Sequence, residues 1–222
     1  MMLCIDQVLT AEELAQITTK LKNAEFVDGK LTAGKHAKEV KNNTQLTGNS
    51  VILQELRSIV NQALQRNRLF QAAVRPKTIR PILFNCYEPG MYYGYHTDNA
   101  IMGTPPMRSD ISLTLFLSSP DTYEGGELVI ETSLGEQTFK LAAGEAIAYP
   151  SSTLHRVEPV KTGMRLAAVT WVQSLIRDAS DREILFDLET VKQVMFEKYG
   201  KTLEFDLVCK TYANLLRKWV DI

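Results

Sequence analysis

The sequence has few cysteines and no spacing that would bring them together. There are three cysteines, an odd count, and no two of them have Cys-x-x-Cys spacing: Cys4, Cys86 and Cys209. A disulfide framework and a thiolate zinc site are therefore not expected. The same scarcity of cysteine favours a reducing, cytoplasmic setting.

The chain also lacks long apolar runs and an excess of charge of either sign. No stretch reaches the roughly 18 consecutive apolar residues of a transmembrane helix, so no membrane span is expected. Residues 1–10 lack the basic region and long apolar run of a secretory signal. The formal net charge is −1, so no global positive field attracts nucleic acid, and no nucleic-acid partner is expected.

Length and apolar content are those of an ordinary globular protein. With 222 residues, 45% of them hydrophobic, the chain can bury a core without disulfides or structural metal. These values fit one domain of generous size, or one domain with helical additions.

Hydrophobic periodicity predicts an N-terminal helical region over residues 1–77, packed on the remainder of the chain. A capping box formed by Thr10 and Glu13 begins its first helix. Residues 25–48 are polar and predict a long loop, and residues 49–68 return to a helical period.

The middle region, residues 78–175, consists of short segments rich in β-branched and aromatic residues and broken by glycine and proline. Several short strands at this spacing predict a sandwich or jelly roll. Pro89-Gly90 has the chemistry of a type II turn. The predicted strands cover residues 79–88, 111–118, 126–131, 136–140, 145–149, 153–158 and 164–173.

Residues 176–222 are predicted to form a C-terminal helical extension. A second capping box, Ser180 with Glu183, is predicted to begin its first helix, and Gly200 to end it. The apolar faces of these helices predict burial against the barrel, over the site, or against a second copy in a homo-oligomer.

His96, Asp98 and His155 can form a metal site. The chain has only three histidines, and two of them lie in the strand-rich middle. On a strand, residues i and i+2 point to the same face, about 7 Å apart along the backbone, so His96 and Asp98 can converge on a metal. His155 can supply a third ligand from a different strand. Two imidazoles and one carboxylate leave open coordination positions, as non-haem iron(II) oxygenases require.

Arg165 supplies a second signal, because a His-x-Asp triplet alone is weak evidence. It lies ten residues after His155, within the apolar run 164–172. A guanidinium among such neighbours needs an anionic partner, since a buried unpaired charge is costly. The partner can be a dicarboxylate co-substrate, which arginine binds through two parallel hydrogen bonds. It can equally be an Asp or Glu of the protein in a structural ion pair.

A combined motif surrounds the first two metal-ligand candidates. The motif is Y-x-x-G-x-x-Y-x-x-H-x-D, formed by Tyr87, Gly90, Tyr93, His96 and Asp98. This string resembles prolyl 4-hydroxylases and their relatives.

Downstream segments match the same pattern in order and spacing: Glu124–Leu128, Gly144–Glu145 and Leu154–Val160. With helical extensions at both ends, the chain is similar to the bacterial PKHD-type hydroxylases, a group of Fe(II)/2-oxoglutarate-dependent dioxygenases. The motifs cover about residues 80–173, and the helical flanks match only in outline.

The resemblance implies an α+β fold, a double-stranded β-helix (jelly roll) core with N- and C-terminal helical extensions. It implies iron(II) at His96, Asp98 and His155, and Arg165 on the distal carboxylate of 2-oxoglutarate. It suggests that the Tyr87 hydroxyl adds a hydrogen bond to this co-substrate, and it admits ascorbate as a reductant. The implied activity is hydroxylation of an unactivated C–H by dioxygen, with release of succinate and CO2.

The substrate and two other functional classes stay open. The resemblance suggests a peptidyl proline or lysine, or a small amino-acid-like molecule, but many prolyl 4-hydroxylases have Lys where this chain has Arg165. The alternatives are a cupin-like metal enzyme that does not use 2-oxoglutarate, and a non-catalytic metal-dependent binding or sensing module. Asn99 and Arg108 flank the expected mouth of the site and are candidates for substrate contact. His36, in a polar loop, is a weaker candidate for substrate contact, because a lone surface histidine is usually solvated.

Overall fold

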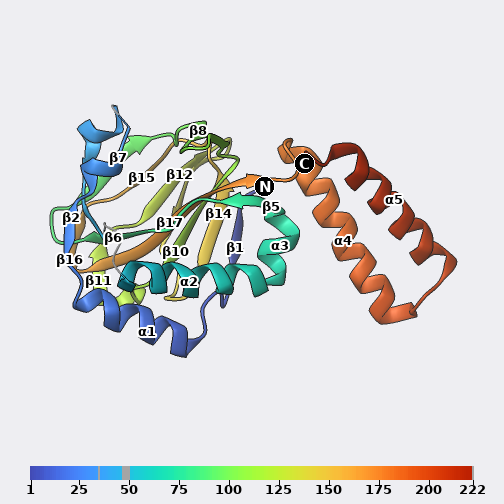
Figure 1. Ribbon diagram of the computed structural model, residues 1–222, viewed down its shortest axis with the longest axis horizontal. Helices are drawn as coiled ribbons and strands as arrows, with labels where there is room; N and C mark the ends of the chain where they lie inside the picture. Colours follow the sequence, from blue (N-terminus) through green and yellow to red (C-terminus); the bar gives the residue numbers. More distant parts are fainter. Residues whose placement is uncertain (35, 47–50, 222) are drawn as a thin grey trace.

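The computed structural model describes residues 1–34, 36–46 and 51–221 (Figure 1). Two antiparallel sheets face each other, and the N-terminal helices cover the outer face of the larger one. The last two helices form a hairpin that extends to one side of the sheets, beyond the N-terminus. Among the described helices, none has the length and apolar content needed to span a membrane.

The larger sheet has the strand order β1-β14-β10-β17-β6-β4-β2, and β5 pairs with β17. Every pairing in it is antiparallel. Its strands are β1 (Leu3–Ile5), β2 (Phe26–Asp28), β4 (Thr44–Leu46), β5 (Pro76–Ile79), β6 (Leu83–Tyr87), β10 (Ile111–Phe116), β14 (Ala146–Pro150) and β17 (Arg165–Ser174).

The smaller sheet has the order β13-β12-β15-β7-β3, and two short ribbons pair β8 with β9 and β11 with β16. Two facing antiparallel sheets around a common interior are the jelly-roll arrangement predicted from the sequence. Each predicted strand segment overlaps a strand of the structure. The remaining strands are β3 (Lys41–Asn42), β7 (Tyr92–His96), β8 (Ile101–Met102), β9 (Met107–Arg108), β11 (Tyr123–Gly125), β12 (Leu128–Thr132), β13 (Gly135–Phe139), β15 (His155–Val157) and β16 (Val160–Gly163).

The three N-terminal helices bury their apolar faces against the larger sheet. The predicted capping box is confirmed, since the Glu13 amide donates to Thr10 Oγ1 and the Thr10 amide donates to the Glu13 carboxylate. The predicted type II turn is also confirmed, with Gly90 at a φ of 86° and the Met91 amide bonded to the Glu88 carbonyl. The helices are α1 (Ala11–Lys22), α2 (Val51–Arg66), α3 (Arg68–Val74), α4 (Ala179–Tyr199) and α5 (Leu203–Trp219), with 3-10 turns at Gly29–Thr32, Ala37–Val40 and Pro120–Thr122.

The prediction of a loop over residues 25–48 is wrong for its described part. Strands β2 and β4 extend the larger sheet, and β3 extends the smaller one. A polar segment can still form a strand, because its backbone hydrogen bonds come from a neighbouring strand that is distant in sequence. Residues 47–50, including the start predicted for the second helix, lie outside the described residues.

Two predicted helix boundaries are also corrected. The Asp178 side chain, and not Ser180, caps α4, because its carboxylate accepts from the amides of Ser180 and Asp181. The helix predicted to end near Arg68 is interrupted at Asn67, whose side chain caps a separate helix α3. Gly200 ends α4 as predicted. The division at residues 77 and 175 into three regions stays a prediction.

A hydrogen-bonded triangle ties α3 to the C-terminal hairpin. The Arg75 guanidinium donates to the Tyr212 hydroxyl and to the Glu189 carboxylate, each at 2.8 Å. The Tyr212 hydroxyl in turn donates to Glu189, also at 2.8 Å. Burial would raise the pKa of Glu189, but the bonds from Tyr212 and Arg75 outweigh it and lower that pKa below 4.5.

We expect Glu189→Gln to lower the free energy of unfolding by about 2 kcal/mol at neutral pH, because it weakens charge-assisted bonds to a buried arginine. Denaturant unfolding of the variant and of Glu197→Gln, an exposed change on the same helix, measures the difference. The stabilisation by the carboxylate is present above pH 4.5 and is lost as the pH falls through the lowered folded-state pKa, so the difference should shrink in acid. Equal stabilities of the two variants at pH 7 would contradict the structural role of the triangle.

Candidate metal and co-substrate site

The site lies in a cavity of about 590 Å³ between the two sheets. All five residues singled out from the sequence line it: Tyr87, His96, Asp98, His155 and Arg165. Tyr87 and Arg165 belong to the larger sheet, His96 and His155 to the smaller one, and Asp98 follows β7, so the fold brings the predicted site together.

His96 and His155 face each other across neighbouring strands. His96 ends β7, His155 begins β15, and the two residues are cross-strand partners with ring centroids 4.2 Å apart. Each Nδ1 donates to a backbone carbonyl two residues earlier, that of Gly94 at 2.8 Å and that of Thr153 at 2.9 Å. This bond holds each ring in the tautomer whose Nε2 carries a free lone pair, the form that binds a metal.

Asp98 completes a group of three potential ligands. It lies beyond the end of β7, so the expectation that His96 and Asp98 share a strand is wrong, but their side chains still converge. One ligand atom from each of His96, Asp98 and His155 lies within 4.8 Å of the others, and His155 Nε2 is 3.8 Å from Asp98 Oδ2. The donor set of two imidazoles and one carboxylate fits iron(II) and leaves open positions.

The surroundings keep His96 uncharged. Burial, together with the neighbouring His155, lowers the pKa of His96 well below its usual range. The Tyr93 ring stacks on the His96 ring at a centroid distance of 3.6 Å. A neutral, immobilised imidazole is the state that coordination to a metal needs.

Ser112 holds Asp98 in place. Its hydroxyl donates to Asp98 Oδ2 at 2.5 Å and is also hydrogen-bonded to the Ser151 hydroxyl at 2.8 Å. We expect Ser112→Ala to weaken iron(II) binding by about 10-fold or more, as loss of an outer partner of a metal ligand usually does. Titration with iron(II) under anaerobic conditions measures this, with Ser151→Ala as the control that leaves the bond to Asp98 intact. An unchanged iron affinity would show that Ser112 has no such role.

Arg165 is a buried cation that lines the same cavity as the three candidate ligands. It is 2% exposed, begins β17, and is the cross-strand partner of Tyr87. Its guanidinium lies over the rings of Tyr87 and Phe116, at 5.0 and 5.5 Å from their centroids, and its Nε has no hydrogen-bond partner. No ion pair within the described part of the chain includes Arg165. The alternative of a structural ion pair is therefore not what the described residues form, and the charge is available to an anion in the cavity.

Tyr87 can donate a hydrogen bond at neutral pH. Burial raises the pKa of its phenol, although the nearby positive charge of Arg165 partly opposes this. The hydroxyl therefore keeps its proton beside the guanidinium. A carboxylate bound to Arg165 could therefore accept hydrogen bonds from both the guanidinium and the Tyr87 hydroxyl.

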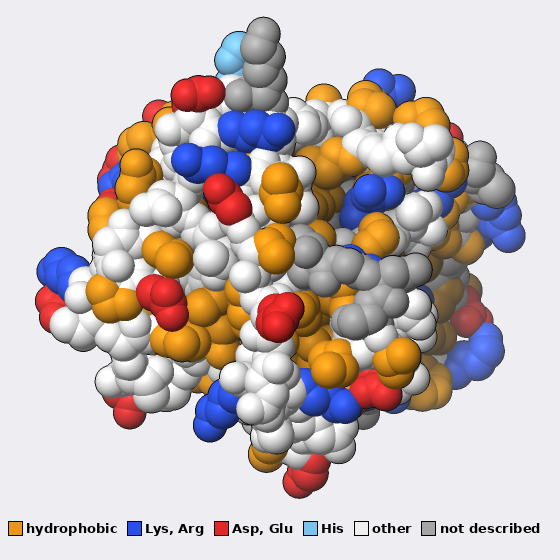
Figure 2. Space-filling view, turned by 60° about the vertical axis from the view of Figure 1, so that its left-hand side comes forward, with side chains coloured by type: hydrophobic (Ala, Val, Ile, Leu, Met, Phe, Trp, Pro, Cys, Tyr) orange, Lys and Arg blue, Asp and Glu red, His pale blue; other side chains and the backbone are white. Residues whose placement is uncertain are grey.

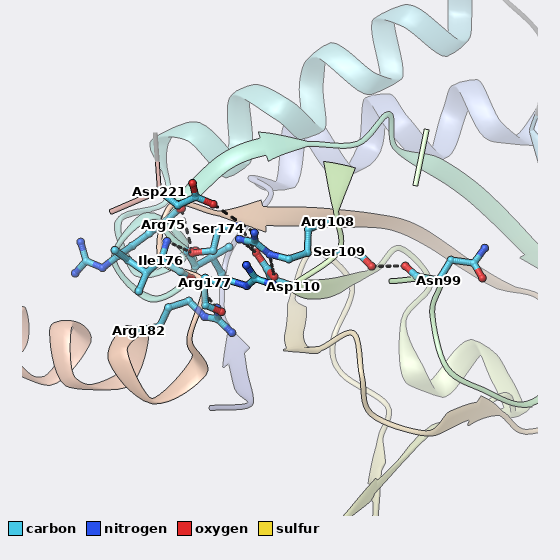
Figure 3. Close-up of polar contacts among 11 residues, drawn as sticks. Arg75, Asn99, Arg108, Ser109, Asp110, Ser174, Ile176, Arg177, Arg182 and Asp221 are labelled. Carbon is cyan, nitrogen blue, oxygen red and sulfur yellow. Dashed lines mark hydrogen bonds and ion pairs between the residues drawn. The ribbon is translucent and has the colours of Figure 1, made fainter. Parts of the chain in front are cut away.

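The three residues left open as substrate contacts differ in position. Asn99 lines the cavity. Arg108 points away from it, because its guanidinium is bonded to Asp110 at 2.6 Å and to Asp221 at 3.3 Å (Figure 3). It ties the barrel to the C-terminal end of the chain. His36 is exposed and does not line the cavity.

The sequence-based interpretation missed Ser112 and Lys41, both of which line the cavity. Ser112 had a local signal, since Ser112 and Thr114 alternate with Ile111, Leu113 and Leu115, and alternate positions of a strand face one side. Lys41 had none, because it lies in a mostly polar segment that was predicted to be a loop, and its place on β3 was not foreseen.

Comparison with known proteins agrees with this geometry. The sequence model of the 2OG-Fe(II) oxygenase superfamily matches residues 82–173, which contain all five site residues. A crystal structure of a prolyl-4-hydroxylase from Pseudomonas putida superposes with a TM-score of 0.55 at 17% identity, covering 78% of this chain and 92% of that one. At this identity the likeness establishes the fold, and the predicted α+β, jelly-roll class is confirmed. The protein is thus an iron(II)- and 2-oxoglutarate-dependent oxygenase.

Full-length relatives narrow the family. A PKHD-type hydroxylase from Synechococcus sp. (strain JA-2-3B'a(2-13)) is 59% identical over 100% of both chains. One from Thermosynechococcus vestitus is also 59% identical over 100% of both chains. The chain belongs to the PKHD-type hydroxylases.

Proposed function

We propose that this enzyme hydroxylates an unactivated C–H of a small-molecule or peptidyl substrate, with release of succinate and CO2. In this proposal His96, Asp98 and His155 hold iron(II), and Arg165 and Tyr87 hold 2-oxoglutarate. The observation that carries it is the presence of the three ligand residues and an unpaired, buried arginine in one cavity. When bound, iron(II) and 2-oxoglutarate supply a dioxygen-dependent oxidation that is coupled to decarboxylation of the co-substrate.

The chain's own side chains bind and orient in this reaction. Arg165 binds the distal carboxylate of 2-oxoglutarate through its two-pronged donor face, and the Tyr87 hydroxyl donates to the same end. Ser112 fixes the rotamer of Asp98, and the carbonyls of Gly94 and Thr153 fix both imidazoles. The apolar walls around Arg165 exclude water, which strengthens its attraction for an anion.

The two alternative functions make different predictions. A cupin-like enzyme without 2-oxoglutarate has no use for Arg165, and a purely structural metal site usually completes four ligands within the protein. The three-residue ligand group and the unpaired guanidinium both favour the oxygenase proposal.

An anaerobic titration of the apoprotein tests the proposal. Iron(II) and then 2-oxoglutarate are added while the visible charge-transfer band of the chelate is followed, after which oxygen is admitted and succinate is measured. We expect a band only with both additions, followed by succinate. Iron binding with neither band nor succinate would favour the cupin-like or binding-module alternatives.

Assembly of copies through the C-terminal helices stays a prediction. The hairpin of α4 and α5 exposes apolar side chains, including those of Val191, Phe196, Tyr199 and Leu203. Sedimentation velocity of the purified protein would measure the oligomeric state directly.

A further inference from the structure

The cavity carries more positive charge than the proposed reaction uses. Among the described residues that line it, the charged side chains are those of Lys41, Arg57, Arg80, Arg165 and Asp98. Iron(II) and the 2-oxoglutarate dianion neutralise each other, and the one carboxylate offsets a single cation. The whole chain has a net charge of −1, and Figure 2 shows basic and acidic side chains interspersed on the face that it draws. The excess is therefore local to the cavity.

Lys41 is the most unusual of these cations. It is 5% exposed, lies on β3, and is the cross-strand partner of Tyr93 on β7. Its Nζ lies 5.0 Å from the centroid of the Tyr93 ring, the ring that stacks on His96. The ammonium group is thus placed beside the candidate metal ligands, with one aromatic ring touching both.

The buried ammonium group of Lys41 has almost no hydrogen-bond or ion-pair partner among the described residues. Its only side-chain hydrogen bond within the described residues goes to Thr32 Oγ1 at 3.3 Å, and it is absent from their ion pairs. Desolvation lowers the pKa of Lys41 to about 8, against the opposing charges of Asp28 and Asp98. A buried ammonium without an anion is costly, and an anionic ligand would remove that cost.

Arg80 adds a second cation to the cavity lining; it lies between β5 and β6 of the larger sheet, whereas Lys41 lies on β3 of the smaller one. Its guanidinium lies against Gly103, and no ion pair of the described residues includes it. Arg57 is less available, since its Nε donates to the Ile82 carbonyl at 2.9 Å. Lys41 and Arg80 are therefore the charges left for a ligand other than 2-oxoglutarate.

We propose that the substrate hydroxylated in this cavity is a small molecule with a free carboxylate, which Lys41 binds and Arg80 also contacts. The inference rests on the proposed function and narrows its substrate class. A cavity of about 590 Å³ is in the range that holds drug-sized ligands, so it has room for such a molecule beside 2-oxoglutarate. Because Lys41 lies near the metal ligands, a carboxylate bound there brings the neighbouring C–H groups toward the reactive centre.

Charge-matched probes test this inference. The holoprotein with iron(II) and 2-oxoglutarate is titrated anaerobically with a panel of N-acetyl amino acids and with their neutral carboxamides, and the shift of the chelate band is followed. We expect acids to shift the band, and carboxamides of the same acids to have little effect. Admission of oxygen should then release succinate faster with the acids that bind.

Variants locate the effect. Lys41→Met should raise the dissociation constant of the binding acids about tenfold, the size expected for one charge-assisted hydrogen bond. Lys38→Met is the matched control, because Lys38 is exposed and does not line the cavity. Arg80→Met should also raise the dissociation constant of the binding acids. It tests the inference if Lys41→Met is destabilised and melts below the wild-type temperature.

The outcomes separate the two proposals. If the wild-type chelate band never forms, the proposed function fails. If the band forms but acids and carboxamides bind equally, or no acid binds, only the carboxylate inference is overturned. A third outcome is that the acids abolish the chelate band and excess 2-oxoglutarate restores it. The acids would then compete for Arg165, and the carboxylate inference would again be overturned.

Discussion

Replacing His155 by alanine should weaken iron(II) binding by more than about 100-fold, beyond the effect of losing an outer partner of a ligand. The imidazole is 4% exposed, its Nδ1 is held by Thr153, and its Nε2 faces Asp98 at 3.8 Å. No other described imidazole is placed to replace it, since His96 already belongs to the same group of three. Succinate formation should fall to background at the same time.

His36→Ala is the matched control for this experiment, because it removes an exposed imidazole that does not line the cavity. Iron affinity is measured by anaerobic titration, and thermal melting of the apoprotein shows whether each variant is folded. Asp98→Asn, which nearly preserves side-chain volume, should give the same loss of iron affinity. A folded His155→Ala protein with wild-type iron affinity would show that the ligand assignment is wrong.

Replacing Arg165 by methionine should raise the KM for 2-oxoglutarate by about 100-fold, with iron affinity nearly unchanged. Loss of one partner from a buried charge pair costs roughly 2–5 kcal/mol, and each 1.4 kcal/mol is tenfold in affinity. Methionine keeps much of the packing against Tyr87 and Phe116. Because the guanidinium has no protein anion among the described residues, the apoprotein should be at least as stable as the wild type.

Arg156→Met is the control for Arg165→Met, because Arg156 lies outside the cavity and is paired with Glu136 and Glu158. Arg165→Lys keeps the charge but loses the two-pronged geometry, so its KM should lie between those of the wild type and Arg165→Met. Steady-state succinate formation at varied 2-oxoglutarate measures all three. A wild-type KM in Arg165→Met would remove Arg165 from the co-substrate site.

Local patterns were sufficient where the chemistry depends on spacing along one strand or turn. The motif from Tyr87 to Asp98 could be found because its members are close in sequence and each has a distinct chemical role. The burial of Arg165 could also be inferred, since its neighbours on β17 are apolar. The capping box of α1 depends on residues three apart and was correct for the same reason.

The errors fall where distant segments pair. Strand β4 forms on β6, β3 forms on β7, and β2 pairs in turn with β4. Nothing in the sequence of these short segments indicates which distant strand they pair with. Lys41 was missed for this reason. The cap of α4 was misplaced because Ser180 and Asp178 both suit the role, and the path of the chain out of β17 favours the aspartate.

The sequence by itself predicted the residues proposed as metal ligands, the cation proposed for the co-substrate and the jelly-roll class, because alternating strands and short motifs encode them locally. Only the tertiary structure decided that Lys41 and Arg80 face the same cavity, that Ser112 contacts Asp98, and that Arg108 serves the C-terminal junction. Those relations depend on which strands become neighbours. Strand pairing minimises the free energy of the whole chain, and no single segment specifies it.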